Sequence, residues 1–116
     1  MSRSDRERLG DAARHLRSAL DACRLESFDQ LWADRTRRQA LIFDLVIVSE
    51  TLTKLTAETK ALSGRVPWRM ITDTRNRLIH VYWRQDRIFF EEVLRTSAPD
   101  LLEALEALST RLDDVT

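Results

Sequence analysis

The sequence has very few residues that interrupt helices. Its 116 residues include only two glycines, Gly10 and Gly64, and only two prolines, Pro67 and Pro99. Glycine and proline are the least favourable residues in a helix interior. A chain that nearly lacks them, and that is rich in leucine, alanine, arginine and glutamate, is typical of a helical protein. We therefore expect an all-α fold.

Cysteine and long apolar runs are also scarce. Cys23 is the single cysteine, which excludes an internal disulfide and a cysteine-based zinc site. It falls on the apolar stripe of a predicted helix, so we interpret it as a small core residue. The charged first residues lack the apolar stretch of a signal peptide, so none is expected, and no apolar run approaches the length of a membrane span. The length predicts one domain over residues 1–116, and a soluble cytoplasmic protein is the expectation.

Lysine is scarce as well, because all but Lys54 and Lys60 of the 19 basic residues are arginine. Arginine presents a planar fork that matches phosphate oxygens bidentately. The net charge is zero, but six arginines lie between residues 65 and 87, against the acids Asp73 and Asp86, and the segment from residue 91 onward is acidic. This basic centre fits an anionic ligand. A solvated helix face is the alternative explanation.

Apolar residues at helical spacing predict four main helices. Their expected ranges are about 4–23, 36–62, 67–82 and from about 97 to the end. Two short helices or turns are expected at 27–32 and 88–94. Ser4 followed by Glu7 has the form of a capping box. The pattern predicts an up-and-down bundle of four main helices with one or two short ones.

The helix predicted at 36–62 is apolar nearly all round. An inward seam recurs at spacings of four and three residues, formed by Leu41, Leu45, Val48, Leu52 and Leu55. Further apolar residues point in other directions: Ile42, Phe43, Val46 and Ile47. This surplus fits burial against a second copy across a twofold axis. A central helix wrapped by its neighbours is an equal alternative.

The segment 75–82 gathers most of the chemically active groups. Asn76 and His80 are four residues apart and lie on one helix face. Arg75 and His80 are five apart, roughly 140° around an ideal helix. One helix therefore does not aim both at one atom. Two copies meeting across a twofold axis would build a shared cleft with arginine, histidine and asparagine from each.

Such a cleft is equipped for RNA cleavage without a metal. A histidine such as His80 can take the proton of a ribose 2′-hydroxyl or give one to the leaving 5′-oxygen. Arg75 would neutralise the charge of the transition state, and Asn76 would orient the imidazole or donate to a phosphate oxygen. No cluster of acids with histidine indicates a metal site, so we expect neither a metal nor a cofactor. Helix-end capping by the arginine and the histidine is the structural alternative.

Other residues have two readings each. Three arginines are candidate contacts for an RNA backbone or simply solvated surface: Arg69, Arg77 and Arg84. Trp68 and Trp83 could stack on bases, although core or interface packing is favoured for both. Glu50 is either a salt-bridge partner of a motif arginine or exposed. His15 is interpreted as a residue at the boundary of the core.

The motif Arg, four residues, His, one residue, Tyr is formed by Arg75, His80 and Tyr82. With Val66-Pro67-Trp68-Arg69 before it and the run 45–50, the chain resembles the HepT family of HEPN-domain toxins over nearly its whole length. Two segments depart from the family. Ser49-Glu50-Thr51 replaces Gly-Glu-Ala, and Asp73-Thr74 replaces a small or apolar pair. Asp73 could pair with a neighbouring arginine, Arg77 or Arg69, and lower the local positive potential.

The resemblance implies a HEPN-like helical homodimer with a composite ribonuclease cleft, the toxin of a type VII HEPN/MNT toxin–antitoxin system. It implies Arg75 and His80 as catalytic residues supported by Asn76. The implied partner is an MNT-domain nucleotidyltransferase antitoxin (MntA-like), which would transfer AMP onto Tyr82. The competing hypothesis is a non-catalytic HEPN subunit that binds and regulates a minimal nucleotidyltransferase. A helical adaptor with no nucleic-acid role rests on fold class alone.

Overall fold

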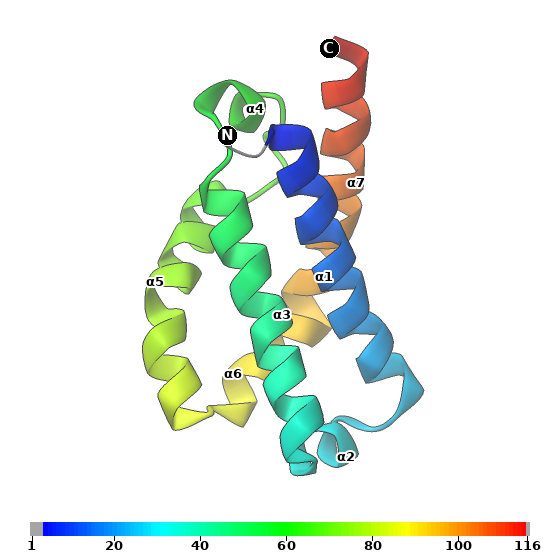
Figure 1. Cartoon of the computed structure of the whole chain (residues 1–116), viewed down its shortest axis with the longest axis vertical. Helices are drawn as coiled ribbons and strands as arrows, with labels where there is room; N and C mark the ends of the chain where they lie inside the picture. Colours follow the sequence, from blue (N-terminus) through cyan, green and yellow to red (C-terminus); the bar gives the residue numbers. More distant parts are fainter. Residues whose placement is uncertain (1–3, 116) are drawn as a thin grey trace.

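The computed structural model describes residues 4–115, apart from the side chains of Ile79, Val81 and Tyr82. The described residues form helices and no strand, which confirms the all-α prediction (Figure 1). The elements are α1 (Asp5–Leu25), α2 (Phe28–Ala33), α3 (Arg35–Thr53), α4 (Ala57–Ala61), α5 (Trp68–Arg84), α6 (Arg87–Glu92), the π-helical segment η1 (Val93–Ser97) and α7 (Ala98–Val115).

The four long helices α1, α3, α5 and α7 run alternately up and down (Figure 1). Helix α1 packs against both α3 and α7, and α5 packs against α3 along one flank of the bundle. Three short helices and η1 complete the described chain, where one or two short elements were expected. None of the helices within residues 4–115 is long and apolar enough to cross a membrane.

Helix α1 begins where the capping box predicted. The Ser4 hydroxyl accepts a hydrogen bond from the Glu7 backbone N–H at 3.1 Å, and the Glu7 carboxylate accepts one from the Ser4 N–H at 3.3 Å. The helix continues to Leu25, two residues past the expected end. Cys23 is half-buried and packs against the core, as expected for a small core residue.

The prediction of one long helix over residues 36–62 is wrong. Helix α3 ends at Thr53, and α4 restarts after Thr56, whose hydroxyl caps it by accepting a hydrogen bond from the Thr59 N–H at 3.3 Å. Threonine hydroxyls compete with the helix for backbone partners and therefore favour caps over helix interiors. The carboxylate of Asp5 reinforces the break, because it accepts hydrogen bonds from the Thr56 N–H at 3.2 Å and from its hydroxyl at 2.6 Å.

Helix α3 packs against α1, α2 and α5. All five residues of the predicted seam are buried, four on α3 and Leu55 just beyond its end: Leu41, Leu45, Val48, Leu52 and Leu55. Ile42, expected to point elsewhere, is fully buried as well, so the neighbouring helices cover much of the surplus apolar surface. Val46 and Ile47 are half-buried, and Phe43 has 57 % of its surface exposed. The apolar surface left uncovered on α3 is therefore most open at Phe43.

The last helix follows its predicted stripe. It begins at Ala98, close to the expected start near residue 97. Leu105, Leu108 and Leu112 are buried, and Leu101 and Leu102 pack partly against the core. The amphipathic pattern predicted this burial because leucines three and four residues apart share one face of a helix.

Candidate functional site

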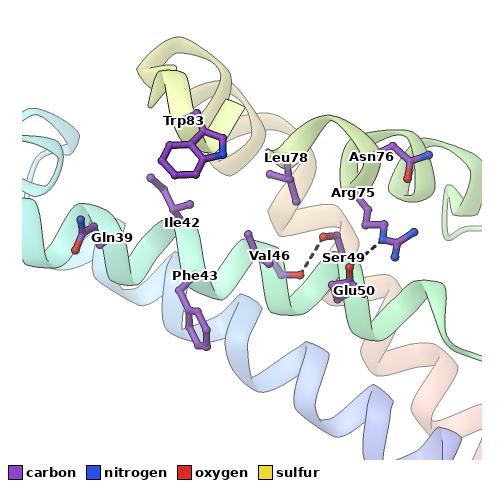
Figure 2. A pocket seen from close by; sticks show the side chains of 10 residues that line it. All are labelled: Gln39, Ile42, Phe43, Val46, Ser49, Glu50, Arg75, Asn76, Leu78 and Trp83. Atoms are coloured by element: carbon purple, nitrogen blue, oxygen red, sulfur yellow. Dashed lines mark hydrogen bonds and ion pairs between the residues drawn. The ribbon is translucent and has the colours of Figure 1, made fainter. Parts of the chain in front are cut away.

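A groove of about 710 Å³ runs between α3 and α5. It is lined by Gln39, Ile42, Phe43, Val46, Ser49, Glu50, Arg75, Asn76, Leu78 and Trp83. Figure 2 shows that its two ends differ in character: at one end Trp83 of α5 lies over Ile42 of α3, and at the other Arg75 reaches toward Glu50. The groove thus joins an apolar, aromatic end to a polar, charged one.

An ion pair closes the polar end. The Arg75 Nε group donates a hydrogen bond to Glu50 Oε1 at 3.0 Å, and the two side chains are 42 % and 37 % exposed (Figure 2). Of the two possibilities for Glu50, the salt-bridge partner of a motif arginine is confirmed. The bond uses the Nε–H of the guanidinium, so the two terminal amino groups of Arg75 lie outside it.

The neighbouring Ser49 is buried, and its hydroxyl donates to the Val46 carbonyl of the same helix at 3.0 Å. That internal hydrogen bond satisfies the one polar side chain that α3 buries at this point. The charged atoms that face the groove therefore come from Glu50 and Arg75.

Arg75 and Asn76 both line the groove, whereas His80 is not among the described residues that line it. His80 is exposed and lies on α5, one turn beyond Asn76. The structure brings the arginine and the asparagine together in one groove and leaves the histidine outside it. This arrangement agrees with the helical geometry, in which five residues of separation point Arg75 and His80 in different directions.

Tyr82 lies in the last turns of α5, and its side chain is outside the described part of the structure. Its expected modification stays a prediction.

The three candidate RNA contacts are exposed side chains of α5: Arg69, Arg77 and Arg84. The guanidinium of Arg77 lies 5.7 Å from the centre of the Phe89 ring. Among the described ion pairs, none joins Asp73 to Arg69 or Arg77, so these arginines are not neutralised in the way that the sequence suggested. Their contact with RNA stays a prediction.

The two tryptophans of α5 have different surroundings. Trp68 is half-buried, and its indole N–H donates to the carbonyls of Lys60 and Ser63, both at 3.1 Å, as core packing predicted. Trp83 is 79 % exposed, so core packing is wrong for this residue. It covers the apolar end of the groove instead.

His15 is a boundary residue, as expected. Its Nδ1 lies 2.8 Å from Asp44 Oδ1, and its side chain is 28 % exposed. The pair joins α1 to α3. Sequence reasoning missed Asp44 because the two residues are 29 positions apart and no local pattern connects them.

Comparison with known proteins identifies the family of the chain. A family model described as "Ribonuclease HepT-like" matches residues 9–108, a range that includes Glu50, Arg75 and His80. The chain is 27 % identical to "Probable ribonuclease HepT" of Thermococcus cleftensis over 108 residues, covering 93 % of this chain and 98 % of that protein. It is 31 % identical to a "Putative RNase" of Caldanaerobacter subterraneus subsp. tengcongensis over 70 residues, covering 60 % of this chain and 62 % of that protein. No solved structure matches. The chain belongs to the HepT-like ribonuclease family.

Proposed function

We propose that this protein is the toxin of a type VII HEPN/MNT toxin–antitoxin system. It acts as a homodimeric, metal-independent endoribonuclease whose composite site takes Arg75, Asn76 and His80 from both protomers. An MNT-domain antitoxin silences it by transferring AMP onto Tyr82. Family membership supports the ribonuclease activity, since a relative over nearly the whole chain carries that name.

One observation carries the composite site. Arg75 and Asn76 line the groove between α3 and α5, while His80, on the same helix, lies outside it. General acid–base chemistry needs the imidazole within hydrogen-bond reach of the atoms that react beside the arginine. A second copy can supply that imidazole across a twofold axis. The exposed apolar side chains of Phe43 and Trp83 beside the groove support such a contact.

The reaction follows from the groups available. His80 of one protomer removes the proton of a ribose 2′-hydroxyl, and the 2′-oxygen forms a bond to the adjacent phosphorus. The bond from phosphorus to the 5′-oxygen breaks, and that oxygen takes up a proton from an imidazolium. The products carry a 2′,3′-cyclic phosphate and a 5′-hydroxyl. Arg75 stabilises the additional negative charge on the phosphorane-like transition state.

Cleavage of RNA in buffer containing EDTA tests the activity. We expect the unmodified protein to cut RNA under these conditions and to leave 2′,3′-cyclic phosphate ends. Arg75→Ala and His80→Ala should each lower the rate at least about 100-fold, the scale at which loss of a general base or of a charge-stabilising donor acts. Circular dichroism of each variant checks that the fold is kept. Wild-type rates in both variants would overturn the assignment.

Transfer of AMP onto Tyr82 would silence the ribonuclease for an electrostatic reason. An AMP group adds negative charge beside a site that must attract a polyanion, so it repels the RNA backbone. After co-expression with an MNT-domain nucleotidyltransferase, we expect the intact mass to rise by whole AMP units and cleavage to stop. Tyr82→Phe should show neither change. An unmodified wild-type protein in that experiment argues against this form of regulation.

The non-catalytic regulatory subunit is the alternative, and the ion pair of Glu50 with Arg75 is the observation in its favour. The charges of Glu50 and Arg75 cancel, so the net charge of the groove is zero and the groove attracts RNA less strongly. A protein that binds the nucleotidyltransferase tightly but never cleaves RNA would support this alternative over the toxin.

A further inference from the structure

We propose that Glu50 is a positioning residue for the cleavage reaction: it holds the Arg75 guanidinium so that its two terminal amino groups face the scissile phosphate. The role rests on the proposed ribonuclease activity. The proposal goes beyond that activity because it gives a function to the Glu50 carboxylate. A negative charge is otherwise unfavourable in a groove that binds RNA.

The geometry carries the proposal. The 3.0 Å hydrogen bond from Arg75 Nε to Glu50 Oε1 uses the inner edge of the guanidinium and joins α5 to α3 (Figure 2). Since the guanidinium is planar and rigid, a hydrogen bond at Nε restricts the directions in which the terminal amino groups can point. The two terminal amino groups can then bind two phosphate oxygens at once. The arginine is already ordered before RNA binds, so less conformational entropy is lost on binding.

The rigidity of α3 makes Glu50 a suitable anchor. Its neighbours Val48, Ser49 and Leu52 are buried, so the backbone at Glu50 is held by core packing. Arg75, by contrast, is an exposed residue of α5 with a long, flexible side chain. Through its hydrogen bond with Glu50, the Arg75 side chain is restricted by the rigid backbone of α3.

The position of the pair argues against a mainly structural role. Both side chains are more than one-third exposed, and ion pairs of that exposure contribute little to stability. A negative charge beside the phosphate site also opposes RNA binding. The carboxylate is therefore expected to act on the two kinetic constants in opposite directions: it raises kcat by orienting Arg75, and it raises KM by repelling the substrate.

Two variants separate these effects. In Glu50→Ala the charge and the hydrogen-bond acceptor are both lost, so we expect KM for RNA to fall roughly threefold, as removal of one nearby surface charge predicts. We expect kcat to fall about 10- to 100-fold, because a misplaced group costs that much. Glu50→Asp keeps the charge but is one methylene shorter, so KM should stay at the wild-type value while kcat still falls. A general loss of structure would change KM in the same direction in both variants. A fall in KM in only one of them therefore indicates a specific effect of the charge.

The matched control is Glu106→Ala. Glu106 pairs with Arg17 at 3.2 Å between α7 and α1, at similar exposure, and α7 lies on the other side of the bundle from α5 (Figure 1). This variant loses the same charge and an equivalent ion pair, so kcat and KM should both stay unchanged.

An independent measurement follows Arg75 itself. The 15N–1H resonance of its Nε–H, assigned by comparison with Arg75→Lys, should shift and exchange faster with water in Glu50→Ala. If the resonance and both kinetic constants are unchanged while wild type cleaves RNA, the positioning role is wrong and the proposed activity stands. If wild type does not cleave RNA at all, the proposed function fails, and the positioning role fails with it.

Discussion

At the residue scale, the carboxylate of Asp5 joins the start of α1 to the start of α4. It accepts hydrogen bonds from the N–H and hydroxyl of Thr56 and from the hydroxyl of Thr59, the last at 2.5 Å. Burial alone would raise the pKa of this carboxyl, but the hydrogen bonds of Thr56 and Thr59, together with Arg8, lower its pKa below the ordinary value. The ionised form is therefore the one that the fold prefers.

Substitution of Asp5 tests this contribution. Asp5→Ala should lower the free energy of unfolding by about 1 to 3 kcal/mol, because the hydroxyls and the N–H of the threonines lose a charged acceptor. Because the pKa of Asp5 is lowered in the folded state, its stabilisation is complete at neutral pH and is lost as pH falls through that lowered pKa. Urea unfolding at pH 7 and at about pH 3 measures both effects.

Asp21→Asn on the same helix is the control, since Asp21 forms an exposed pair with Arg24 one turn away. It should change the free energy of unfolding by less than about 0.5 kcal/mol. An Asp5→Ala variant no less stable than this control would contradict the structural role.

Single residues were predicted unevenly. The sequence identified Arg75, Asn76 and His80 as chemical candidates because of their type and spacing. It left Glu50 undecided between pairing and exposure, because its partner is 25 positions away. It also favoured core or interface packing for Trp83, and core packing is wrong because that side chain is mostly exposed. Residue type indicates what a side chain can do, whereas its partner depends on how distant helices meet.

At the element scale, patterns confined to one helix predicted well. The capping box set the start of α1, and the leucine stripe set the buried face of α7. Both signals are local, since caps and helix faces involve residues three or four positions apart. Helix position and inner face could therefore be predicted for most of the bundle.

The break between α3 and α4 was missed for a physical reason. The apolar seam continues through Leu52 and Leu55 without interruption, so periodicity alone predicts one helix. The chain leaves the helix at Thr53 because Thr56 begins a new cap and Asp5, 51 positions earlier, binds it. Only the packing of α1 beside this turn supplies that partner.

At the scale of the whole molecule, the composite site gives the sharpest prediction. Arg75→Ala keeps His80, and His80→Ala keeps Arg75, so the shared cleft of a mixed dimer holds one arginine and one histidine, each from a different chain. If protomers exchange freely at equal concentrations, half of the dimers are mixed, and part of the wild-type activity should return.

Measurement of cleavage before and after the two inactive variants are mixed and allowed to exchange tests this prediction. Arg75→Ala mixed with a double variant, Arg75→Ala with His80→Ala, is the control and should stay inactive, because no dimer contains an arginine at position 75. Activity that does not return in the first mixture, despite exchange shown by mass spectrometry, would indicate a site within one chain.

The sequence by itself determined the helical class, the faces of most helices and the chemical groups of the motif, because these depend on residues within a few turns of one another. It also indicated that Arg75 and His80 diverge, since helical spacing alone sets that angle. Tertiary structure decided which groups meet. The contact of α3 with α5 pairs Glu50 with Arg75, opens the groove beneath Trp83, and covers Ile42 while Phe43 stays exposed. Such contacts join positions far apart in sequence, so they follow from the packing of the whole core and not from any local pattern.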